Sequence, residues 1–203
     1  MDEKNTLGNI EFTEMFDNPV IKSTGTPYPE SFYFSKFYDE AEYKRFIKNT
    51  ERLIRTSKEY TKYLELLHTN ITALNMDNIL SNITAADAEF EFHHYPLTLY
   101  DIVDIVSSYK FLSGEAFNSF TVAKTVLDEH FKNTIGLVPL TKTNHELAHA
   151  GALFLSSKQV FGNYTQFMKT YETAISIDIK ERIKKMEELT NDPNSISDIR
   201  GLF

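Results

Sequence analysis

The sequence predicts an α+β fold that is predominantly helical and contains one small two-stranded sheet. Most of the chain carries apolar residues at helical spacing. Two short segments differ. Residues 88–93 alternate phenylalanine with glutamate, and residues 137–140 form an apolar run, Leu-Val-Pro-Leu, whose proline suits a strand end or edge. We therefore expect flanking helices around one pair of strands.

The length and composition fit one globular domain with terminal extensions. The chain has 203 residues, of which 41% are hydrophobic and 25% charged, so it can bury a core. Residues 1–36 are rich in Gly, Pro, Asn and Thr and predict an extended N-terminal arm. We expect a single α-rich domain at 37–190 and a loose tail at 191–203. The aromatic end of the arm should pack on the body or on a second copy, which would make a homo-oligomer.

Several helices are predicted inside this domain. One begins at about Asp39, and a second follows an N-cap at Ser57. The periodicity predicts further helices at 97–107, 115–133, 164–173 and 177–189. Residues 70–88 are Asn-rich and predict no clear element.

The residues that are missing limit the chemistry. The chain has no cysteine, so any metal ion must be held by His, Asp or Glu. The N-terminus has no basic segment followed by an apolar one, and no apolar run approaches a membrane-spanning length. We therefore expect a soluble, cytoplasmic protein with no membrane partner.

The charge is acidic overall but locally basic. A net charge of −8 argues against coating nucleic acid through bulk electrostatics. The basic residues that could still contact DNA are Lys44, Arg45, Lys48, Arg52, Arg55, Lys58 and Lys62. These residues alternate with glutamates, so a solvated helix face of mixed charge is the other interpretation.

Four of the six histidines occur in two short segments. His93 and His94 end the predicted strand, whereas His145 and His149 are four residues apart in a predicted helix. Two histidines at this spacing lie one turn apart on one helix face and can share a metal ion. The Thr143-x-x-Glu146 pattern is a capping box, which predicts that this helix begins at about Thr143 and continues through Phe154.

A strand that ends in His-His, a Leu-Val-Pro-Leu strand and a helix with His-x-x-x-His resemble the ββα-metal, or HNH, nuclease motif in its colicin-like form. The resemblance covers about residues 89–155 and implies a ββα-metal core. It implies that His93, His145 and His149 are metal ligands and that His94 is the catalytic base. The implied function is endonucleolytic hydrolysis of DNA phosphodiester bonds with Zn²⁺, Mg²⁺ or Mn²⁺. The wider set of motifs also resembles uncharacterised HNH-like proteins of large tailed bacteriophages, which would place the chain in a host cytoplasm.

The chain departs from that motif. Gly136 stands where the motif usually has the Asn that orients the base, and about forty residues, rather than a short loop, separate His94 from it. Adjacent residues of a regular strand also face opposite sides. His93 and His94 can therefore reach one ion only if the chain turns at Tyr95 and Pro96.

Other interpretations use the same histidines. The three predicted ligands could hold a structural metal ion, with Glu91 or a water, in a catalytically inactive phage accessory or interaction protein. His145-Glu146-Leu147-Ala148-His149 also matches the HExxH pattern of zinc metalloproteases. Finally, the histidines could bind no metal and donate hydrogen bonds to backbone carbonyls.

Overall fold

The computed structural model describes residues 6–7, 10–11, 37, 40–80 and 82–191. Within these residues it is mainly helical with a two-stranded antiparallel sheet, which confirms the predicted fold class. Apart from the short strands β1 (Thr6–Leu7) and β2 (Ile10–Glu11), the predicted arm lies outside the described residues. The predicted tail beyond Asn191 lies outside them too, so the oligomer predicted through the arm stays a prediction.

The chain divides into two compact units, each described by itself. The first comprises residues 1–60 and 99–128, and the second comprises residues 61–98 and 129–203. Both strands of the sheet at residues 90–94 and 137–141 belong to the second unit, which also holds every predicted site residue. The predicted division into an arm, a single α-rich domain and a tail stays a prediction.

The first unit is built on α2 (Glu40–Arg55) and α4 (Leu99–Leu112), as their apolar stripes predicted. Ile47 and Ile54 on α2 are fully buried, and Phe37 packs edge-on against Phe46. The Tyr43 hydroxyl on α2 donates a 2.6 Å hydrogen bond to the carboxylate of Asp104 on α4. Burial raises the pKa of the Asp104 carboxyl, which the bond from Tyr43 partly offsets.

Two of the basic residues of α2 form ion pairs within their own helix. Lys44 lies 2.6 Å from Glu40, and Arg55 lies 2.9 Å from Glu51, each pair at i,i+4 spacing on the exposed surface. Such pairs are typical of a solvated helix face and need no ligand. This arrangement supports the interpretation of mixed charge and gives no support to a DNA contact.

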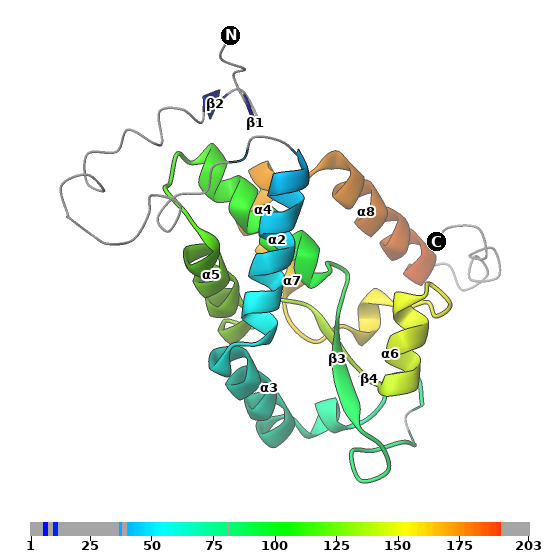
Figure 1. The fold of residues 1–203 in the computed structure, drawn as a ribbon. Helices are drawn as coiled ribbons and strands as arrows, with labels where there is room; N and C mark the ends of the chain where they lie inside the picture. The colour runs from blue at the N-terminus through cyan, green and yellow to red at the C-terminus, as the bar shows by residue number, and fades with distance from the viewer. Residues whose placement is uncertain (1–5, 8–9, 12–36, 38–39, 81, 192–203) are drawn as a thin grey trace. The chain divides into compact units, whose positions relative to one another are not determined.

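The second unit contains the sheet of β3 (Phe90–His94) and β4 (Leu137–Thr141), with α6 (Lys142–His149) beside it (Figure 1). It also contains α7 (Tyr164–Thr170), α8 (Ile177–Asn191) and most of α3 (Lys58–Asn70). The short helices in it are η3 (Thr72–Asn75), η4 (Ser157–Gln159) and η5 (Glu172–Ala174). Among the described residues, no helix is long and apolar enough to cross a membrane.

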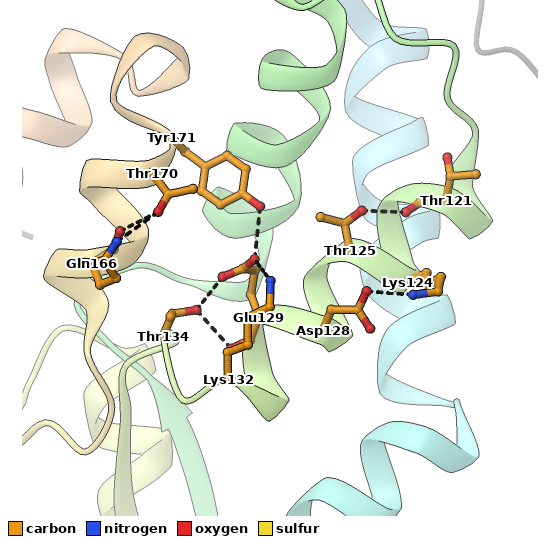
Figure 2. A network of polar contacts seen from close by, with 10 residues as sticks. All are labelled: Thr121, Lys124, Thr125, Asp128, Glu129, Lys132, Thr134, Gln166, Thr170 and Tyr171. Atoms are coloured by element: carbon orange, nitrogen blue, oxygen red, sulfur yellow. Dashed lines mark hydrogen bonds and ion pairs between the residues drawn. The ribbon is translucent and has the colours of Figure 1, made fainter.

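A buried glutamate fixes the last turn of α5 (Ser119–Phe131) within the second unit. The Glu129 carboxylate accepts hydrogen bonds from Thr134 at 2.7 Å and from the Tyr171 hydroxyl at 3.3 Å, and it pairs with Lys132 at 2.9 Å (Figure 2). Glu129 is only 5% exposed, so its charge needs these partners. The network holds His130, the next residue, in a defined position.

Residues 70–88, for which no element was predicted, are organised by Asp77. This carboxylate is 1% exposed and accepts bonds from the backbone N–H of Ile79 and Leu80, from the Thr141 N–H and from the Asn144 side-chain amide. It therefore ties the loop after η3 to the junction between β4 and α6. Burial alone would raise the pKa of the Asp77 carboxyl, but these four donors lower it below its usual value.

We predict that Asp77→Asn lowers the free energy of unfolding by about 3 kcal/mol at pH 7, because buried N–H donors lose an ionised acceptor. Urea unfolding followed by tyrosine fluorescence measures this loss. Asp87→Asn is the matched control. Among the described residues, the exposed Asp87 carboxylate accepts bonds from Thr84 alone, so its replacement should have a clearly smaller effect.

The same variant tests the pH dependence. The pKa of Asp77 is lower in the folded chain, so its stabilising contribution is complete above the ordinary carboxyl range and is lost as the pH falls through the lowered pKa. Asp77→Asn should therefore flatten the acid limb of the stability curve. An unchanged acid limb would contradict the role of this carboxylate.

Candidate metal centre

The pairing of β3 with β4 decides which way each histidine of β3 points. The strands are antiparallel, with His93 opposite Val138 and His94 opposite Leu137. The ring of His93 lies 5.2 Å from that of His145 and 4.8 Å from that of His149, both on α6. The ring of His94 lies instead 5.3 Å from that of His130 on α5. Strand alternation therefore persists through His94, and no turn at Tyr95 brings it to the side of His93.

Helix α6 presents its two histidines to β3. Their Nε2 atoms are 3.2 Å apart, as expected for residues one helical turn from each other. The predicted capping box is wrong: the N-cap is Thr141, whose hydroxyl accepts from the Asn144 N–H, so the helix begins at Lys142. The predicted extension through Phe154 is also wrong, since the helix ends at His149.

Three of the four predicted residues form one cluster. His93, His145 and His149 each offer a ligand atom, and these atoms lie within 4.8 Å of one another. His93 is buried, His145 is half-buried and His149 is exposed, so the cluster opens to solvent on the α6 side. Three imidazoles with an open side are a donor set that suits zinc and other late first-row metals, whereas Mg²⁺ prefers oxygen ligands.

Glu91 orients one of these imidazoles. Its carboxylate lies in hydrogen-bond contact with Nδ1 of His145, whose Nε2 faces His149. A proton on Nδ1 that is donated to Glu91 leaves Nε2 with the lone pair that a metal requires. Glu91 is two residues before His93 in β3, so strand alternation places both on the face that meets α6.

His94 belongs to a separate, buried pair. Its Nε2 lies 3.0 Å from Nε2 of His130, and the two side chains are 6% and 0% exposed. Two imidazole nitrogens at this distance require one donor and one acceptor. No role was predicted for His130, because no sequence pattern around it indicates that its partner comes from β3.

Gly136 explains one departure from the nuclease motif. A Cβ atom at this position would lie 2.1 Å from the carbonyl oxygen of Tyr95 and 2.8 Å from Cγ1 of Val160. The Gly136 carbonyl also accepts the Tyr95 N–H at 3.0 Å, which continues the strand pairing by one step. An Asn here would clash with backbone, so this fold excludes the residue that orients the base in the motif.

The comparison with known families decides the identity. A family model described as bacteriophage G278-like virion protein matches residues 3–200, nearly the whole chain. The chain belongs to this family. It is therefore a phage protein, of a family described as virion proteins. No curated protein and no solved structure matches it.

Family membership corrects several predictions. A G278-like virion protein is a part of the phage particle, which conflicts with the predicted DNA endonuclease and with its hydrolase and DNA-binding character. The family description points to the phage particle as the location, which contradicts the predicted host cytoplasm. The family match supports the predicted resemblance to phage proteins, but it shows no HNH or nuclease family. A strand pair and a helix with this histidine pattern can hold a metal without any catalysis.

We predict that Gly136→Ala lowers the free energy of unfolding by about 3 kcal/mol, because the new methyl group meets a backbone carbonyl that cannot move aside. The control is Gly114→Ala. Gly114 has a φ of +68° but nothing within 4 Å of a Cβ, so only the backbone strain remains, about 1 kcal/mol. Thermal unfolding of both variants measures the two losses. Equal losses would contradict the close contact of Gly136 with the Tyr95 carbonyl.

Proposed function

We propose that the chain is a non-catalytic component of the virion in which a divalent metal ion, with Zn²⁺ as the best fit, joins β3 to α6. The proposed ligands are His93, His145 and His149. The observation that carries the proposal is that three imidazoles from two elements converge, with the Glu91 carboxylate in contact with Nδ1 of His145.

The position of this cluster supports a structural purpose. A sheet of two strands is marginally stable alone and depends on what packs against it. The chain has no cysteine and can form no disulfide to hold the sheet to α6. A metal ion bound to one residue of β3 and two of α6 would supply that link, and its binding free energy would add to folding.

Assembly fits this purpose better than catalysis does. A virion protein works by packing with other components of the particle, and a rigid β3–β4–α6 surface would present a constant shape to them. A structural zinc site is four-coordinate, so a water would have to complete the shell of three imidazoles. The proposal needs no catalytic base and no DNA partner.

We predict that Zn²⁺ at about one hundred times its dissociation constant raises the midpoint of thermal unfolding by about 5 to 10 °C. His149→Ala should remove this shift, because two imidazoles bind the ion far more weakly than three. His68→Gln is the control, since His68 lies outside the cluster and bonds Asn75 at 3.0 Å. It should keep the zinc-dependent shift even if its baseline midpoint falls.

We also predict that Glu91→Ala lowers the affinity for Zn²⁺ by about tenfold or more, because the His145 ring loses the group that orients it. Glu89→Ala removes an exposed carboxylate two residues earlier that is not one of the cluster residues, and it should leave the affinity unchanged. Isothermal titration gives both values. Equal affinities for the two variants would show that Glu91 has no part in the site.

A further inference from the structure

A small cavity opens beside the histidine cluster in the second unit. It has a volume of about 160 Å³ and lies between the end of β3, the segment after α6 and helix α8. His93 is the proposed metal ligand that lines it. The remaining lining residues come from outside the cluster, so the cavity has chemistry of its own.

The walls of the cavity are apolar and its charged residues are all basic. Leu153, Leu155, Ile183 and Met186 supply apolar surface, and Leu155 is 2% exposed. Arg182 and Lys185, both exposed on α8, line the cavity as well. Among the described residues that line it, none is acidic, although α8 carries several glutamates elsewhere.

The size of the cavity selects among ligand classes. Pockets for cofactors and drug-sized ligands measure about 300–1,000 Å³, which is well above this volume. An apolar cavity of about 150 Å³ in another protein holds a single benzene ring. The space here therefore matches one large apolar side chain and is too small for a nucleotide or a flavin.

We propose that this cavity is a docking site for a segment of another virion protein that presents a large apolar side chain next to a carboxylate. The side chain would fill the apolar floor as an anchor, which is how buried aromatic residues contribute to interfaces. The carboxylate would lie between Arg182 and Lys185. We choose an acidic partner on the basis of charge complementarity. The chain has a net charge of −8, but the charged residues at this cavity, Arg182 and Lys185, are basic and would attract a carboxylate.

This site is independent of the proposed metal ion. Peptide docking uses the apolar floor and the cations of α8, whereas metal binding uses ring nitrogens on β3 and α6. His149→Ala should therefore abolish zinc binding and leave peptide docking intact, so that the failure of one proposal can be told from the failure of the other.

The test uses the full chain and three blocked tetrapeptides: acetyl-Gly-Phe-Glu-Gly-amide, its Phe-Gln analogue and its Ala-Glu analogue. Backbone amide shifts in ¹⁵N spectra report the binding. The Phe-Glu peptide should give saturable shifts at residues 153–155 and 182–189. The Phe-Gln peptide should bind about fivefold more weakly, since it lacks the charge. The Ala-Glu peptide should give no saturable shift.

A pair of charge reversals on α8 completes the test. Lys185→Glu should weaken binding of the Phe-Glu peptide about fivefold or more, while Lys180→Glu, on the same helix but outside the cavity, should not. Both residues are exposed, so neither variant should disturb folding. The proposal is overturned by an absence of saturable shifts, by equal binding of the Phe-Glu and Phe-Gln peptides, or by equal effects of the two reversals.

Discussion

The register of β3 against β4 is the constraint on which the candidate centre depends. With His93 opposite Val138, the side chain of His93 faces α6 and that of His94 faces His130. Because side chains alternate along a strand, a slip by one residue would exchange these two environments. Glu91 would leave the α6 face in the same slip. One backbone register therefore sets the three-imidazole cluster, its orienting carboxylate and the separate histidine pair.

Two features outside the strands hold this register. Asp77 binds the Thr141 N–H at the end of β4 and the Asn144 amide in α6, so strand and helix keep their relative positions. At the other end, Gly136 lets the backbone of β4 approach Tyr95 more closely than any side chain would permit. A negative charge and a missing side chain thus act at opposite ends of the same strand.

The sequence predicted the parts of this structure that depend on local periodicity. The predicted strand at 88–93 and the observed β3 nearly coincide, and Ser57 accepts the Tyr60 N–H at 3.1 Å, as expected of an N-cap. The i,i+4 spacing of His145 and His149 predicted a shared helix face, and their rings are adjacent. What periodicity could not supply was the partner of each residue across the fold. Asp77 accepts a bond from Asn144, 67 residues away, and His130 contacts His94, 36 residues away. No local sequence pattern indicates either contact.

Function was the part that the histidine pattern predicted wrongly. The spacing of His93, His145 and His149 constrains which ion could be held, but it contains no information about whether a substrate is cleaved. The family model describes a virion protein and matches nearly the whole chain, whereas the nuclease resemblance covered about residues 89–155. The histidine cluster and the family match are consistent with each other if the ββα arrangement serves as a metal-stabilised surface in the particle.

X-ray absorption at the zinc edge of the purified full chain, loaded with one equivalent of Zn²⁺, would show whether the three imidazoles bind one ion. We expect a first shell that includes three imidazole nitrogens at about 2.0–2.1 Å, with the outer-ring scattering that histidine gives. A first shell made of oxygens alone, or no retained zinc after desalting, would contradict it.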